Sequence, residues 1–143
     1  SSAASDVYKR QDIYNDFGGR LNENISEIVS IITDGKYNDV KLDENMHISV
    51  FDDDHYMPIE FLSSGTIEQI YLAVRLCIAG LLCKDRMPII VDDIFTAYDE
   101  HRLKNALYCM SRIDTDQVII FTSNNAIGDM LDDLSMEYNY VEL

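Results

Sequence analysis

The sequence predicts an α/β protein with a mostly parallel sheet that is flanked by helices and preceded by a β-hairpin. Two continuous apolar runs, residues 87–91 and 118–121, are typical of parallel strands that are covered on both faces. Segments with apolar residues three and four positions apart separate and follow these runs, as in amphipathic helices. Strands that alternate with helices at these lengths predict parallel pairing, with the helices packed on the sheet.

The first predicted helix covers residues 12–34. Its apolar residues recur every three or four positions between Ile13 and Ile32, which gives the helix one apolar face. Gly35 is expected to end it. Residues 1–11 have no such face and resemble, in part, the translated end of a sequencing adapter, so we expect an artefactual or disordered tail there.

A β-hairpin is predicted after this helix. Apolar residues alternate before and after the turn-forming residues 43–45, and the acidic loop 52–54 follows. This pattern indicates two short antiparallel strands ahead of the main α/β part.

Three further helices are predicted in the remainder of the chain. Thr66 and Gln69 have the spacing of a capping box at the start of the first of them. A final strand is expected at residues 138–141, where apolar and polar residues alternate. The helical patterns lie at residues 67–81, 103–110 and 127–134.

The composition indicates a folded domain with an acidic surface. Of the 143 residues, 47% are hydrophobic and 26% are charged, which excludes a disordered or low-complexity chain. The formal net charge of −15 excludes a general basic surface for nucleic acid or anionic membrane. An odd number of cysteines, with no signal peptide or membrane span in the sequence, predicts a cytoplasmic protein without a membrane partner.

Polar residues follow both predicted parallel strands. Asp92 and Asp93 end the first strand, and residues 122–124 follow the second. Open parallel sheets bind ligands at the carboxyl ends of their strands. One carboxylate can hold Mg²⁺ while the other orients or deprotonates an attacking water in a nucleotide site. Aspartate also ends strands as part of turns and helix caps, so this pattern alone leaves both interpretations open.

A second candidate feature is the hydroxyl-rich turn of residues 63–66. A turn at a helix N-terminus presents free backbone N–H groups to an anion, and Gly65 permits close approach of a phosphate. An ordinary helix cap explains the same residues, so only the whole set of motifs distinguishes the two interpretations.

The order and spacing of these motifs resemble the C-terminal half of an ABC-type ATPase head in the P-loop NTPase superfamily. The resemblance is to the SMC-, RecN- and YhaN-like ATPases with long coiled coils. It implies that residues 35–143 form the C-terminal lobe and that residues 12–34 are a coiled-coil exit helix. Residues 62–66 resemble the signature motif, and residues 89–93 resemble Walker B. Residues 97–99 resemble the D-loop, and residues 121–124 resemble the strand before the switch histidine.

The resemblance implies a role for each candidate residue. Asp92 takes the magnesium position and Asp93 the position of the catalytic carboxylate, which is usually Glu. Asn124 stands where the family has histidine, and it can hydrogen-bond a phosphate but cannot exchange a proton as histidine does. The residues implied to contact ATP are Ser63, Ser64, Gly65, Thr66 and Asp99.

No GxxxxGK[ST] loop occurs in the sequence. A helix N-terminus stabilises an anion by about 0.3–1 kcal/mol, whereas micromolar binding needs about 8 kcal/mol. This chain alone is therefore expected to be an inactive fragment. The family resemblance implies a Walker A lobe elsewhere in the same protein, a second head in a homodimer, and ATP with Mg²⁺ between the heads. A role with DNA, in repair or chromosome maintenance, follows from family analogy only.

Two other functions remain open from the sequence. In the first, the chain keeps the head fold but is a non-enzymatic interaction module. Asn124 and the missing Walker A loop would then reflect a loss of ATP hydrolysis. Residues 90–93 also resemble the acidic first strand of a phosphorelay receiver domain. Too few residues follow Asp93 to complete a receiver, and no lysine follows Lys104 to fill its basic position.

Overall fold

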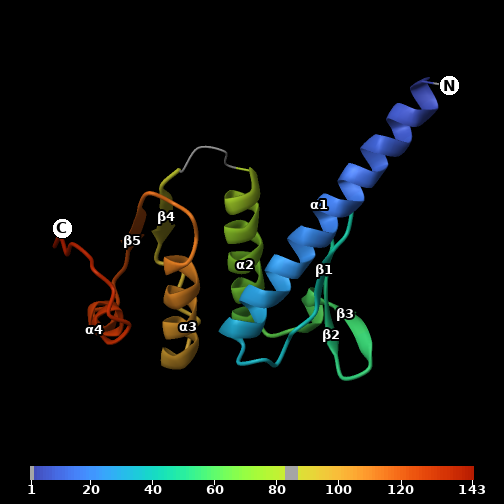
Figure 1. Cartoon of the computed structure of the whole chain (residues 1–143). Coiled ribbons are helices and arrows are strands. Elements are labelled where there is room, and N and C mark those ends of the chain that lie inside the picture. Colours follow the sequence, from blue (N-terminus) through green and yellow to red (C-terminus); the bar gives the residue numbers. More distant parts are fainter. Residues whose placement is uncertain (1, 83–86) are drawn as a thin grey trace.

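The computed structural model describes residues 2–82 and 87–143, and it has the α/β architecture that the sequence predicts (Figure 1). Strands β1, β2 and β3 form an antiparallel sheet in that order, and β4 pairs with β5 in a separate parallel sheet. In the two described ranges no helix has the length and apolar character needed to cross a membrane. The elements are α1 (Ser2–Ile32), β1 (Val40–Leu42), β2 (Ile48–Asp52), β3 (His55–Pro58), the 3-10 helix η1 (Ile59–Phe61), α2 (Ser64–Leu82), β4 (Ile89–Asp92), α3 (Glu100–Ser111), β5 (Val118–Phe121) and α4 (Ala126–Asp133).

Helix α1 begins at Ser2, ten residues before the predicted start. Residues 2–11 are therefore helical in this structure, where the sequence analysis expected an artefactual or disordered tail. Neither glycine nor proline occurs in this segment, so the local sequence contains nothing that ends a helix. In Figure 1 the N-terminal part of α1 extends away from the other elements. The artefactual origin of this segment stays a prediction.

The C-terminus of α1 is closed by two consecutive left-handed residues. Asp34 has φ 54° and Gly35 has φ 77°. The Gly35 N–H donates to the Ser30 carbonyl at 2.7 Å, which is the bond expected of a Schellman motif. The helix ends at Ile32, and the left-handed turn at Asp34 and Gly35 agrees with the predicted role of Gly35 in ending it.

The predicted β-hairpin is present, and a third strand extends it. The Asp43 carboxylate accepts hydrogen bonds from the backbone N–H groups of Asn45 and His47 at 2.8 Å each, which fixes the first turn. The acidic loop forms the turn between β2 and β3, with Asp53 at φ 55°. Strand β3 was not predicted because its sequence, His-Tyr-Met-Pro, does not alternate between apolar and polar residues.

Helix α2 lies between two hydrophobic cores and contributes opposite faces to them. The first core joins α2 to α1 and the antiparallel sheet, and the second joins it to β4, α3 and α4. Because α2 is apolar on both faces, it is buried along most of its length. Its residues in the first core are Ile70, Ala73, Val74 and Cys77, and those in the second are Leu72 and Leu76.

The parallel pair is covered on one face only. Val91 is buried in the second core, whereas Ile90 is 64% exposed and Phe121 is 44% exposed. Ile119 pairs with Ile90 and therefore lies on the same side. We call Ile90, Ile119 and Phe121 the open face. The pairing confirms the predicted parallel strands. Both faces of the pair carry apolar side chains, but the described residues cover only one of these faces.

The final strand predicted at residues 138–141 is absent. These residues have no strand assignment, and Tyr140 is 74% exposed. Alternation can place side chains on two faces, but a strand also needs a neighbour to satisfy its backbone hydrogen bonds. In the described part of the chain, no other strand pairs with this segment.

Candidate functional site

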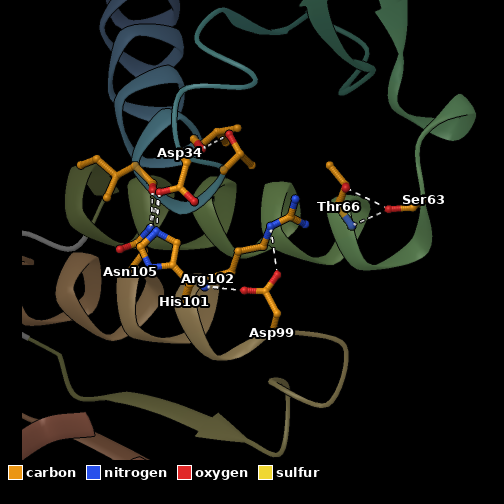
Figure 2. A network of polar contacts seen from close by, with 10 residues as sticks. Asp34, Ser63, Thr66, Asp99, His101, Arg102 and Asn105 are labelled. Carbon is orange, nitrogen blue, oxygen red and sulfur yellow. Dashed lines mark hydrogen bonds and ion pairs between the residues drawn. The ribbon is translucent and has the colours of Figure 1, made fainter.

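Ser63 caps the N-terminus of α2. Its Oγ accepts a hydrogen bond from the Thr66 backbone N–H at 3.3 Å and lies 2.9 Å from the Thr66 hydroxyl (Figure 2). The predicted capping box of Thr66 and Gln69 is therefore wrong. Ser63 and Thr66 have the same three-residue spacing one turn earlier, and the Gln69 side chain is buried instead.

The loop before α3 packs against the first turn of α2. A Cβ atom on Gly65 would lie 3.1 Å from the carbonyl oxygen of Ala97. The absence of a side chain at Gly65 thus permits this approach of backbone to backbone. The structure brings together two segments that the sequence analysis identified separately, residues 63–66 and residues 97–99. Ser63 and Ser64 remain exposed, whereas Thr66 is buried.

Asp99 caps α3. Its Oδ1 accepts a hydrogen bond from the Arg102 backbone N–H at 2.9 Å, and its Oδ2 lies 3.3 Å from the Arg102 Nε (Figure 2). Aspartate is among the preferred residues at this position because its oxygen satisfies a free N–H group. The Asp99 carboxylate is exposed and is oriented by the start of the helix.

Two buried polar groups lie near these segments. The Tyr98 hydroxyl and both polar atoms of the Gln69 amide have no hydrogen-bond partner among the described residues. Burial, and to a smaller extent the Glu68 carboxylate, raises the pKa of the Tyr98 hydroxyl above its ordinary range. Tyr98 therefore stays neutral.

The carboxyl ends of β4 and β5 bring the acidic pair next to the polar residues that follow β5. Asp92 is exposed at the end of β4 and pairs in register with Phe121. Asp93 follows with φ 46°, and its backbone N–H donates to the Phe121 carbonyl at 2.9 Å. The Ser123 hydroxyl donates to Asp93 Oδ1 at 3.3 Å. This juxtaposition agrees with the parallel pairing that the sequence predicts.

Asn124 begins the turn into α4. Its backbone N–H donates to the Thr122 hydroxyl, and its side-chain Oδ1 accepts from the Ala126 N–H, both at 3.0 Å. The side-chain oxygen is thus used in the turn, which leaves Nδ2 as the group able to reach a phosphate. Sequence reasoning placed Asn124 in the site and overlooked Ser123, because nothing in the sequence indicates which of three consecutive polar side chains meets the acidic pair.

The oxygen donors at the end of β4 suit Mg²⁺ chemically. Magnesium prefers carboxylate, phosphate and water oxygens, and it is commonly held by one or two carboxylates together with substrate phosphates. Across the described residues, no cluster of three or more potential ligands is present. The exposed Asp92 carboxylate can supply one oxygen ligand of this kind.

The chain is similar in sequence to the uncharacterized protein YhaN of Bacillus subtilis (strain 168). The two are 30% identical over 116 residues, which is 77% of this chain and 12% of the relative. The chain thus spans only a small part of the length of this curated relative. No protein-family model matches the chain.

Two solved structures share its fold. An SMC head domain from Thermotoga maritima matches with a TM-score of 0.59 and 19% identity, over 78% of this chain and 40% of that chain. A second comes from work on ATP-driven dimerization and DNA-stimulated activation of SMC ATPases. It matches with a TM-score of 0.66 and 20% identity, over 85% of this chain and 78% of that chain.

Proposed function

We propose that this chain, which has the fold of an SMC- and YhaN-like ATPase head lobe, supplies the C-terminal half of an ATP-hydrolysing site. The observation that carries this proposal is the pair Asp92 and Asp93 at the carboxyl end of β4, next to the residues after β5. Ligands of open parallel sheets bind at this edge.

Each carboxylate takes a different role. Asp92 holds Mg²⁺, which would neutralise charge on the phosphates during transfer. Asp93 accepts a proton from the attacking water as the oxygen–phosphorus bond forms and the bond to the ADP oxygen breaks. Asn124 donates from Nδ2 to the γ-phosphate, since its Oδ1 is used in the turn.

The site is complete only when other parts are added. A Walker A lobe of the same protein holds the ATP phosphates, and a second head presents the start of its α2 to the γ-phosphate. Exposed Ser63 and Ser64 with the first N–H groups of α2 suit such a contact, while Gly65, Thr66 and Asp99 hold the contact surface in shape. The similarity to SMC ATPases that dimerise with ATP supports this head-to-head partnership.

The test is the variant Asp93→Asn in a head that contains both lobes. Loss of the proton acceptor should reduce ATP hydrolysis by about 10²–10⁴-fold, which is the usual size of a general-base effect. ATP-dependent dimerisation, measured by light scattering, should persist because the phosphate contacts remain. Asp129→Asn, an exposed aspartate on α4, is the matched control. Hydrolysis at the wild-type rate by the Asp93 variant would refute the assignment.

A non-enzymatic interaction module is the second candidate. It is favoured by Asn124, whose side-chain oxygen is committed to the turn into α4 instead of facing a substrate. In that case the wild-type head binds ATP and dimerises but releases no phosphate. The fold similarity to SMC heads gives no support to a phosphorelay receiver. Action on DNA in repair or chromosome maintenance belongs to the same proposal and rests on analogy with SMC ATPases.

A further inference from the structure

We propose that Ser123 is a positioning residue for Asp93, and that its hydroxyl aims the carboxylate at the attacking water. This inference rests on the proposed function. It assigns a role to a residue that lies in a motif-like segment but receives no role from the resemblance, and that the structure alone brings to the acidic pair.

The backbone of Asp93 is held by the segment that follows β5. The ladder of the parallel pair ends with Asp92 opposite Phe121, and the Asp93 N–H adds one more bond to the Phe121 carbonyl at 2.9 Å. Asp93 then turns sharply, with φ 46°, a conformation that residues other than glycine seldom adopt. This turn ends the strand and directs the Asp93 side chain toward Ser123.

The side chain of Asp93 is held by the same segment. Ser123 Oγ donates to Oδ1 at 3.3 Å, which leaves Oδ2 to receive the proton of the attacking water. A proton acceptor must be held within hydrogen-bond reach of its water, and small misplacements lower the rate strongly. Ser123 is exposed, so its side chain has no role in either hydrophobic core.

Asp93 also differs from the family glutamate in a way that suits this arrangement. Its side chain is one methylene shorter and has one torsion fewer, so one hydrogen bond restricts much of its remaining freedom. The step itself transfers a proton from water to Asp93 Oδ2 while oxygen bonds to phosphorus and ADP departs. Ser123 gives up no proton in this step and acts only through the carboxylate.

The test compares Ser123→Ala with Ser123→Thr in a head that contains both lobes. The alanine variant should lower kcat about tenfold, because the proton acceptor loses its orientation. The KM for ATP and ATP-dependent dimerisation should stay unchanged, since in this proposal Ser123 acts on Asp93 and not on the nucleotide. Ser123→Thr retains the hydroxyl and should restore kcat. Ser111→Ala, which removes another exposed serine hydroxyl bonded to the Tyr108 carbonyl, is the matched control.

A double variant separates positioning from a general structural effect. In the Asp93→Asn background, Ser123→Ala should cause no further loss of kcat, because the group through which it acts is already removed. Equal fractional losses in both backgrounds, or full kcat in Ser123→Ala, would overturn the inference. A wild-type head without hydrolysis would instead overturn the proposed function.

The contact can also be tested in the 143-residue chain without nucleotide. Amide hydrogen exchange at Asp93 should become about tenfold faster in Ser123→Ala, because a hydrogen bond to a charged acceptor is lost from the turn. Exchange at Asp93 should be unaltered in Ser111→Ala. An unchanged Asp93 exchange rate in Ser123→Ala would show that the serine does not hold the carboxylate.

Discussion

Several candidate residues have a structural task besides their proposed contact with ATP. Ser63 caps α2, Asp99 caps α3, and Asn124 closes the turn into α4. Replacing Ser63 or Asp99 with alanine removes a cap that contributes about 1 kcal/mol to stability. Loss of activity at these positions must therefore be separated from loss of stability. Asp93 lacks this ambiguity, since its carboxylate caps no helix in the described chain.

Gly65 and Gly80 form a matched pair on α2. A Cβ on Gly80 meets no atom within 4 Å, so Gly80→Ala should raise the free energy of unfolding by up to about 1 kcal/mol through helix propensity. Gly65→Ala should lower the free energy of unfolding by about 1 kcal/mol, because the new methyl group would lie 3.1 Å from the Ala97 carbonyl oxygen. Urea unfolding of both variants measures the difference. An equal increase in the free energy of unfolding for both variants would show that the loop containing Ala97 does not pack against α2.

The buried thiols of Cys77 and Cys109 should react slowly. Burial raises the pKa of Cys77 to about 12 and that of Cys109 to about 11. Thiolate, the reactive form, is therefore scarce at pH 8, and alkylation should accelerate as pH rises toward these values. Cys83 lies outside the described residues, so the measurement uses a Cys83→Ser background. Rapid iodoacetamide labelling of the folded protein at pH 8 would contradict the buried placement.

At the scale of elements, hydrogen bonds connect the C-terminal end of α1 to α3. Asp34 Oδ1 lies 2.8 Å from His101 Nε2, and Asn105 Nδ2 donates to the Ile31 carbonyl at 2.9 Å and to Asp34 at 3.1 Å (Figure 2). The Asn105 bond gives a second donor to the Ile31 carbonyl, which also accepts from the Asp34 N–H at 3.4 Å. These contacts fix where α1 meets α3.

The variant Asn105→Ala tests this contact between α1 and α3. It removes both amide donations and should lower the free energy of unfolding by about 1–3 kcal/mol, since the Ile31 carbonyl is partly buried. Lys104→Ala is the neighbouring control, because its ion pair with Asp133 is exposed and contributes about 0.2–1 kcal/mol. Denaturant unfolding of both variants gives the comparison. Equal decreases in the free energy of unfolding would mean that the contact between α1 and α3 contributes no more than an exposed ion pair.

The elements that the sequence predicted are those with a strong local pattern. The α1 end, the first hairpin, α2, the parallel pair and the two later helices are all present. Strand β3 was missed because its residues do not alternate, and the final strand is absent because alternation at residues 138–141 has no partner strand. The start of α2 was predicted three residues too late, since two hydroxyl residues, Ser63 and Thr66, compete for the cap.

At the scale of the molecule, the parallel pair has one apolar face that the other described residues leave open. Parallel sheets are ordinarily covered on both faces. Under the proposed function, the Walker A lobe covers Ile90, Ile119 and Phe121.

Ile90→Lys should therefore weaken association with that lobe, measured by calorimetric titration, by at least tenfold, because a charge would be buried at the contact. It should leave the unfolding free energy of this chain within about 0.5 kcal/mol, since Ile90 is exposed here. Met46→Lys, at the exposed turn of the first hairpin, is the control and should alter neither quantity. Unchanged association of Ile90→Lys would place the lobe elsewhere.

The sequence by itself determined the α/β class, the order of the motifs and the identity of most candidate residues. Periodicity, caps and turn residues act over a few positions, so a single sequence records them directly. Only the tertiary structure decided which residues meet. The Ser123–Asp93 contact joins residues 30 apart and the His101–Asp34 contact joins residues 67 apart, because packing of α1, α2 and the parallel pair brings them together. No local pattern encodes such distances.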